Sequence, residues 1–211
     1  MKKREYRRMV ERYERELERN RLAQPGVHEF IVVLDHLKPE FNIGKIFRSA
    51  DALGAREVHL VGIGPFDPAP SMGSFRHVPA RFHDEIGECL EELKQWGYTV
   101  YALDPAAREP LPEVEFPDKS AFVFGHEEFG LSFDPADFPG VRLLRIPQFG
   151  KVQSFNVSIA ASIVMYEYVR QKRQGDWGEP RIPVGRGRQP ALDEEPETAA
   201  GRSPAQGRDS K

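Results

Sequence analysis

Short runs of apolar residues alternate along most of the chain with segments in which apolar residues recur at helical spacing. The apolar runs predict five buried strands, at residues 30–34, 58–61, 98–103, 121–124 and 142–146. The helical spacing predicts three helices, at residues 43–53, 85–96 and 156–170. Strands separated by helices indicate an α/β fold, a mostly parallel sheet with helices on both faces.

The two ends of the chain differ from this pattern. Before Pro25-Gly26, one helical stripe carries Tyr6, Met9, Val10, Tyr13 and Leu17 among many charged residues, so we expect residues 1–25 to form a basic amphipathic helix. Residues 26–175 hold the alternating pattern and form the predicted α/β domain. Residues 176–211 are rich in Gly, Pro, Arg and Glu without apolar periodicity, and we expect this tail to be disordered.

Charge is distributed unevenly along the 211 residues. The net charge is −3 overall, but residues 1–22 carry +4, residues 170–211 carry +2 and the body between them carries −9. A polyanionic partner such as nucleic acid would therefore meet the basic ends and local basic loops. The global charge alone would not suggest nucleic acid.

Several classes of protein are disfavoured by what the sequence lacks. No apolar run approaches the roughly 20 residues of a membrane helix, and the N-terminus has no signal-peptide pattern, so we expect a cytoplasmic protein without a membrane partner. The single cysteine, Cys89, cannot form an internal disulfide, is not expected to build a thiolate metal site, and is predicted to be a core thiol. The six histidines show no HxxxH or HExxH spacing, and no metal site is expected. GxGxxG after the first strand and GxxxxGK[ST] are both missing, which disfavours ordinary dinucleotide or ATP binding.

Three loops that follow predicted strands combine glycine with polar residues. They read HLKPEFNIGKIFRSADALG from residue 36, FGHEEFGLS from residue 124, and IPQFGKVQSFNVSIAASIVMYE from residue 146. Ligands of parallel sheets bind at the carboxyl ends of the strands, where such loops lie. Glycine there lets the backbone approach a ligand closely. These loops are the predicted functional site.

The three loops resemble the motifs of the SpoU (TrmH-like) branch of the SPOUT RNA methyltransferases. The first motif is an Asn-x-Gly-x-x-x-Arg run, here Asn42 to Arg48, and the second is Gly-x-Glu-x-x-Gly, here Gly125 to Gly130. The third is Ile146-Pro147 followed by Ser154-Phe155-Asn156-Val157-Ser158. All three stand in the order and spacing of the family, and the resemblance covers residues 28–172.

The resemblance implies a function and an assembly. It implies transfer of a methyl group from S-adenosylmethionine to a ribose 2′-hydroxyl of tRNA or rRNA. It further implies a SPOUT-like domain over residues 26–175 with a C-terminal trefoil knot, and a homodimer whose active sites lie close to the subunit interface. The motifs specify neither the RNA nor the nucleotide.

The resemblance also assigns residues. The cofactor slot is expected from Leu103, Gly125, Ile146 and Phe155. The catalytic set is expected from Arg48, Asn42, Glu127, Ser154 and Asn156. The family assigns deprotonation of the hydroxyl to the first-motif arginine, here Arg48, with help from a substrate phosphate. A guanidinium stays protonated in proteins, which favours Arg48 as an anchor for phosphate and hydroxyl.

Simpler structural roles are open for the same residues. Asn42 could cap the helix over 43–53, and Ser154 or Asn156 could cap the final helix. Arg48 could be an ordinary surface arginine, and Glu127 a turn carboxylate. The alternative function is a noncatalytic RNA-binding protein that retains the fold, and a third is a methyltransferase that acts on a base or on protein. The combination of Arg48, Glu127 and Asn156 favours an enzyme, because binding alone does not require that set.

Overall fold

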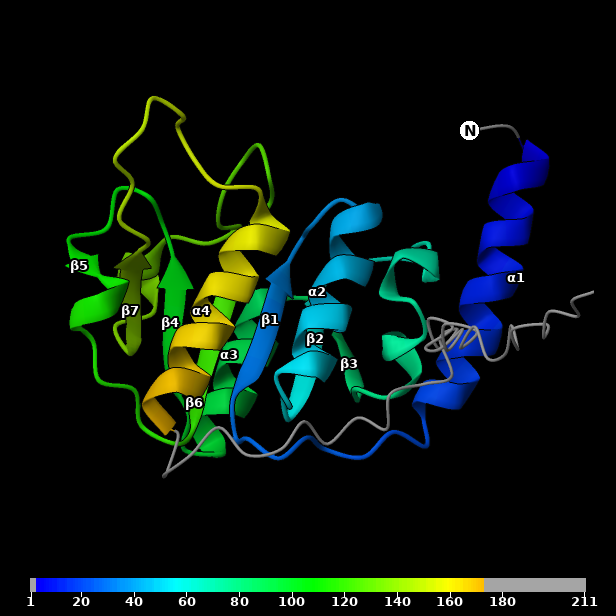
Figure 1. The fold of residues 1–211 in the computed structure, drawn as a ribbon, viewed down its shortest axis with the longest axis horizontal. Coiled ribbons are helices and arrows are strands. Elements are labelled where there is room, and N and C mark those ends of the chain that lie inside the picture. The colour runs from blue at the N-terminus through cyan, green and yellow to red at the C-terminus, as the bar shows by residue number, and fades with distance from the viewer. Residues whose placement is uncertain (1–2, 173–211) are drawn as a thin grey trace, which may run out of the picture. The chain divides into compact units, whose positions relative to one another are not determined.

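A single parallel sheet of seven strands forms the centre of the fold in a computed structural model that describes residues 3–172 (Figure 1). The strand order is β3-β2-β1-β6-β4-β7-β5, and every neighbouring pair is parallel. The strands are β1 (Ile31–Asp35), β2 (Glu57–Val61), β3 (Ala80–His83), β4 (Thr99–Leu103), β5 (Glu109–Pro110), β6 (Ser120–Phe124) and β7 (Val141–Arg145). The α/β class and the parallel sheet predicted from the sequence are confirmed.

Helices cover both faces of the sheet, as predicted. Helices α2 (Phe41–Ala52) and α4 (Val157–Lys172) pack side by side on one face, and α3 (Ile86–Gln95) covers the other (Figure 1). The central strands β1, β2 and β6 are buried along their whole length, because both faces of each strand are covered. Cys89, on the inner side of α3, lies in the core with no exposed surface, as the sequence indicated.

Helix α1 (Lys3–Asn20) joins the core through its second half only. Tyr13 packs against Phe66 and Phe75, whereas Tyr6, on the same predicted stripe, is 49% exposed. At the end of the helix, the buried Asn20 side chain donates hydrogen bonds to the backbone oxygens of Phe75 and Val78, at 2.7 Å for the second, and accepts one from Ala80 N at 3.0 Å. These contacts fix the end of α1 to the segment that leads into β3.

Two strands were missed by the sequence interpretation. The predicted loop over 62–82 covers all of β3 but its last residue, and the loop over 104–119 contains the two-residue β5; these strands form the two edges of the sheet. Strand β3 reads ARFH and is only partly buried, so it lacks the apolar run that marks the central strands. The tail expected at 176–211 lies outside the described residues, and the knot stays a prediction. No helix in the described part of the chain is long and apolar enough to cross a membrane.

Candidate functional site

A cavity of about 530 Å³ opens at the carboxyl ends of β4, β6 and β7. Its walls come from the loops after these three strands and from the first turn of α4. The second and third loops singled out in the sequence thus meet at one place, as the parallel topology requires. The lining residues are Leu103–Pro105, Phe124–Glu128, Gly130, Leu144, Ile146, Gln148 and Gln153–Val157 with Ala160.

The four residues expected to hold a cofactor all line this cavity. Leu103 ends β4, Ile146 follows β7, Phe155 precedes α4 and Gly125 follows β6. Gly125 is required by close packing: a Cβ atom there would lie 2.4 Å from the carbonyl carbon and oxygen of Gly130. The segment between the two glycines is closed by paired backbone hydrogen bonds, His126 N to Gly130 O at 2.8 Å and Gly130 N to His126 O at 2.9 Å.

One hydrogen-bonded network joins the three sequence motifs. Asn42 Nδ2 donates to Glu127 Oε1 at 2.9 Å, which links the first motif to the second. Asn156 Nδ2 donates to Asn42 Oδ1 at 3.2 Å, which links the third motif to the first. The other oxygen of Glu127 accepts from the backbone N–H of Lys38 at 3.1 Å. Residues more than 80 positions apart are therefore arranged around one carboxylate.

The environment of Glu127 keeps its carboxylate charged. Partial burial acts to raise the pKa of Glu127, but hydrogen bonds from Asn42 and from backbone N–H groups of Glu127 and Lys38 act in the opposite direction, and the pKa is lowered overall. At neutral pH the group is an acceptor only. Glu127 therefore serves to orient the amide of Asn42 and is no proton donor.

Of the two asparagines that were candidates for helix capping, only Asn156 caps a helix. Asn156 does cap α4: its Oδ1 accepts from Ser158 N at 3.0 Å and from Ser158 Oγ at 2.6 Å. The amide nitrogen Nδ2 of Asn156 donates to Asn42 Oδ1. Asn156 therefore caps α4 and takes part in the network at the same time. Asn42 caps nothing, because α2 begins two residues earlier than predicted, at Phe41, and places Asn42 inside its first turn.

Two of the predicted catalytic residues stand apart from this network. Arg48 is exposed on α2, does not line the cavity, and forms no ion pair or hydrogen bond with another described residue. Ser154 lines the cavity wall and is exposed, outside the network. The geometry thus brings together Asn42, Glu127 and Asn156 and leaves Arg48 with its guanidinium directed at no partner among residues 3–172.

Sequence reasoning missed the residues that hold the second loop in place. The fully buried Asp35, at the end of β1, accepts hydrogen bonds from Ser132 N at 2.7 Å and Ser132 Oγ at 2.6 Å. Lys38 Nζ also contacts Glu128 Oε1 at 2.7 Å, at a partly exposed pair. The sequence did hold a signal for this contact, because Asp35 is an acidic residue at the end of an apolar strand. A carboxylate buried there needs a hydrogen-bond partner.

Gln148 is a second residue that the sequence did not assign. Its Oε1 atom lies buried in the cavity wall and has no hydrogen-bond partner among the described residues. A buried acceptor without a donor is uncommon in native proteins and indicates that a ligand or solvent supplies one.

The sequence of the chain is similar to those of RNA 2′-O-methyltransferases. The chain is 34% identical over 161 residues to the tRNA (guanosine(18)-2′-O)-methyltransferase of Thermus thermophilus, covering 73% of this chain and 81% of that one. It is 32% identical over 163 residues to the 23S rRNA (guanosine-2′-O-)-methyltransferase RlmB of Neisseria meningitidis, covering 72% of this chain and 61% of that longer protein.

Solved structures agree with the sequence relatives. The SpoU methyltransferase AviRb of Streptomyces viridochromogenes, crystallised in complex with the cofactor AdoMet, superimposes with a TM-score of 0.60 at 26% identity, covering 74% of this chain and 61% of that one. The family model of the SpoU rRNA methylases matches residues 29–166, which include all three motifs and the whole cavity. The chain therefore belongs to the SpoU rRNA methylase family.

Proposed function

We propose that this protein transfers a methyl group from S-adenosylmethionine to a ribose 2′-hydroxyl of tRNA or rRNA. The observation that carries the proposal is the joining of the three motifs by the hydrogen bonds of Asn42, Glu127 and Asn156 beside one cavity. A noncatalytic RNA-binding protein would have no need to hold these groups around a ligand cavity. The relatives named for tRNA and for rRNA methylation support either RNA as the substrate.

The cavity suits S-adenosylmethionine. Leu103, Leu144 and Ile146 supply apolar walls for an adenine ring, and the unpartnered Oε1 of Gln148 can accept a hydrogen bond from its amino group. The missing side chain of Gly125 keeps the second loop close-packed against Gly130. When bound, this cofactor supplies a methyl group on a positively charged sulfur.

The residues around the cavity then have distinct roles in the transfer. The acceptor hydroxyl must be held in line with the methyl group and must lose its proton as the new carbon–oxygen bond forms. We assign to Arg48 the binding of the adjacent phosphate and of the hydroxyl oxygen, because a permanently charged guanidinium lowers the cost of developing negative charge there. The hydrogen bonds of Asn42, Glu127 and Asn156 hold the three motifs together, and we assign to Ser154, which lines the cavity, a part in organising the substrate.

The experiment that tests this function compares nucleosides from cells with and without the gene. Mass spectrometry of digested tRNA and rRNA should show one 2′-O-methylnucleoside that is lost without the gene and restored by purified protein with S-adenosylmethionine. Calorimetry should show that S-adenosylmethionine or its demethylated product binds. Absence of binding would support the noncatalytic alternative, and a methylated base would support the third alternative.

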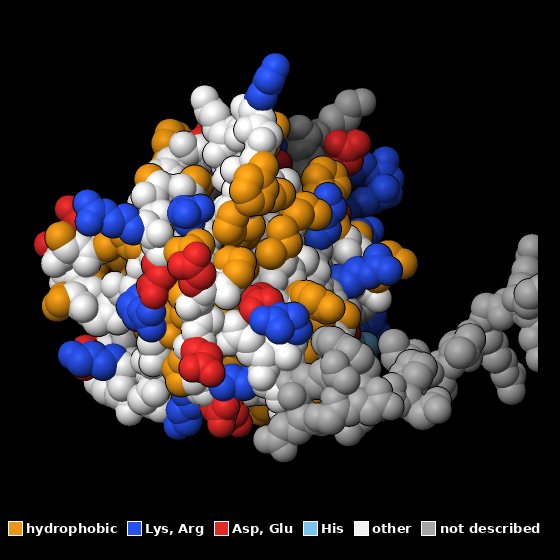
Figure 2. Space-filling model, turned by 60° about the vertical axis from the view of Figure 1, so that its left-hand side comes forward, with side chains coloured by type: hydrophobic (Ala, Val, Ile, Leu, Met, Phe, Trp, Pro, Cys, Tyr) orange, Lys and Arg blue, Asp and Glu red, His pale blue; other side chains and the backbone are white. Residues whose placement is uncertain are grey.

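We further propose a homodimer built on α4. One side of this helix is buried in the core, through Ala161, Val164 and Met165, while Ile159 on another side is 52% exposed. A helix that is apolar on nearly all sides is normally covered on all sides. Figure 2 shows hydrophobic side chains gathered on one face of the molecule. An isologous contact between two copies is the commonest way to cover such a face.

Light scattering should give about twice the chain mass of 24.0 kDa. Ile159→Asp should shift the protein toward the 24.0 kDa monomer, because a carboxylate would be buried in the contact. The matched control is Leu22→Asp, which changes an apolar side chain that is 80% exposed after α1 and should leave the mass unchanged. A wild-type monomer that stays active on dilution would contradict the dimer.

RNA binding beyond the active site is proposed for the outer face of α1. Arg4, Arg8 and Arg15 lie on the side of the helix opposite Tyr13 and form no ion pair with another described residue, whereas Arg12 pairs with Asp67 at 3.2 Å. Unpaired arginines on one stripe can contact phosphates without reading sequence. The protein body is acidic, so the attraction must come from such local groups.

Replacing Arg4, Arg8 and Arg15 together by glutamine should weaken RNA binding and lower its log–log salt slope by about 2–3, at roughly 0.7–0.9 for each lost phosphate contact. Deletion of α1 is a poorer test, because it would also remove Tyr13 and Asn20 from the core. Lys94→Gln, on α3, is the control. An unchanged salt slope in the folded triple variant would show that α1 packs against the protein body and does not bind RNA.

A further inference from the structure

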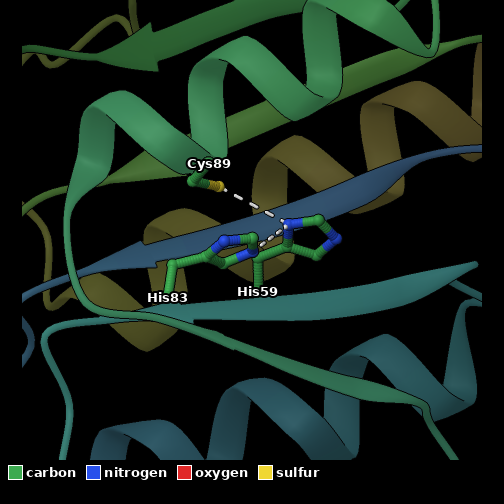
Figure 3. A group of neighbouring side chains, drawn as sticks. All are labelled: His59, His83 and Cys89. Atoms are coloured by element: carbon green, nitrogen blue, oxygen red, sulfur yellow. Dashed lines mark hydrogen bonds between the residues drawn. The ribbon is translucent and has the colours of Figure 1, made fainter.

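Three side chains with metal-binding atoms converge under α3, away from the cavity. His59 comes from the middle of β2, His83 from the end of β3 and Cys89 from α3 (Figure 3). Their donor atoms all lie within 4.8 Å of one another. None of the three residues lines the cavity or takes part in the network around Glu127.

The spacing of these atoms suits a small tetrahedral ion. His59 Nδ1 lies 3.1 Å from His83 Nε2 and 3.5 Å from Cys89 Sγ. Ligands of tetrahedral zinc, at about 2.0–2.1 Å for nitrogen and 2.3 Å for sulfur, are about 3.3–3.6 Å apart. Small movements of the rings would therefore place all three atoms at bonding distance from one ion.

Hydrogen bonds among the three residues do not satisfy the cluster. If His59 Nδ1 accepts from its neighbours, then Nε2 carries the proton, and if Nδ1 donates, Nε2 is a bare acceptor. In both cases Nε2 is buried without a hydrogen-bond partner among the described residues, in a side chain with no exposed surface. This atom lies on the side of the ring away from His83 and Cys89 (Figure 3), so an ion bound at Nδ1 would leave it as an N–H directed toward Glu57.

Two carboxylates lie close to the cluster. Glu57 Oε2 lies 3.9 Å from His59 Nε2, on the side of the ring away from the cluster. A histidine that binds metal through one nitrogen normally directs its other N–H toward such a group. Glu92 Oε2 lies 3.7 Å from His83 Nε2 and is a candidate fourth ligand, while Arg81 pairs with both Glu57 and Glu92 and holds them beside the cluster.

The imidazole of His59 is held in the core with no exposed surface. His83, whose side chain is 9% exposed, is the member of the cluster nearest to solvent. An ion could therefore enter past His83 without unfolding the core.

We propose that His59, His83 and Cys89 bind one Zn²⁺ ion, with Glu92 or a water molecule as the fourth ligand. Cys89 binds as the thiolate, and its proton is released to solvent when the ion binds. The site is structural, since it joins β2, β3 and α3 on one side of the sheet and none of its residues lines the cavity. The sequence expectation of no metal site rested on the absence of regular histidine spacing, whereas these three side chains come from three elements at no regular spacing.

The test uses the full-length protein, freed of metal with a chelator and titrated with Co²⁺ and then Zn²⁺. One equivalent of Co²⁺ should produce the near-ultraviolet charge-transfer absorption of a cobalt–thiolate bond and the visible bands of a tetrahedral ion. Zn²⁺ should displace Co²⁺, remove the absorption and raise the unfolding temperature. Elemental analysis of the protein as purified should find zinc close to one ion per chain.

Variants separate the cluster from other metal-binding groups. Cys89→Ser should remove the charge-transfer band, and His83→Ala should weaken Co²⁺ binding at least tenfold. His77→Ala, a matched control at an exposed histidine beside Asp51, should change neither. A folded wild-type protein that shows no thiolate band would overturn the proposal even if both variants fail to fold, and so would equal Co²⁺ affinity in wild type and a folded Cys89→Ser variant.

Discussion

Arg48→Ala should lower the rate of methyl transfer at least 100-fold while S-adenosylmethionine binds nearly as tightly as before. Groups that position or help to deprotonate a reacting hydroxyl are typically worth 10²–10⁴-fold in rate. Arg48 is exposed on α2 and does not line the cavity, whereas the proposed cofactor-binding residues all do. The substitution should therefore change the transfer rate without changing the affinity for the cofactor. Single-turnover transfer to the identified RNA measures the first, and calorimetric titration measures the second.

Two further variants show whether the charge or the shape of Arg48 matters. Lys45→Ala removes another exposed cation of α2, three residues away, and should cost far less activity. Arg48→Lys keeps the charge but loses the planar fork, and should recover only part of the rate. A parallel loss of cofactor affinity in a folded Arg48→Ala protein would show that Arg48 belongs to the cofactor site.

Gly125→Ala should reduce the affinity for S-adenosylmethionine by about tenfold or more. The added methyl group would lie 2.4 Å from the backbone of Gly130 and 2.6 Å from Leu131 N, so the second loop must move. Forced displacement of this kind costs about 1–3 kcal/mol. Because the same loop lines the cavity, the displacement changes the shape of the binding site. Calorimetry measures the change in affinity.

The control for this substitution is Gly140→Ala. A Cβ at Gly140 meets nothing within 4 Å, and this glycine lies before β7, outside the cavity. Its affinity for the cofactor should equal that of the wild type. If Gly125→Ala, folded by circular dichroism, also binds the cofactor with wild-type affinity, then the second loop does not shape the cofactor site.

The central part of the fold was predictable because its signals are local. Strands such as β1 and β6 are buried on both faces, so each is a continuous apolar run that can be recognised without its neighbours. Edge strand β3 carries Arg81 and His83 among its four residues and resembles a loop. This segment forms a strand because it pairs with β2, and the local sequence gives no information about that pairing.

Part of the cavity lining was predictable from the sequence, but the contacts among the site residues were not. The four expected cofactor residues line one cavity, yet the sequence could not tell that Asn156 both caps α4 and reaches Asn42. It also gave no reason to join Asp35 to Ser132, 97 residues apart. Such contacts depend on which strands lie next to each other, and strand order was not determined by the pattern.

The tie between Asp35 and Ser132 has a consequence for how ligands exchange. Moving the second loop away from the cavity would break two hydrogen bonds to a fully buried carboxylate, at a cost that makes such opening slow. The third loop faces solvent instead, with Phe149 98% exposed and Val152 67% exposed. Product departure and cofactor entry should therefore proceed on the side of residues 149–153. Substitutions there should alter the residence time of a bound ligand more than the chemical step itself.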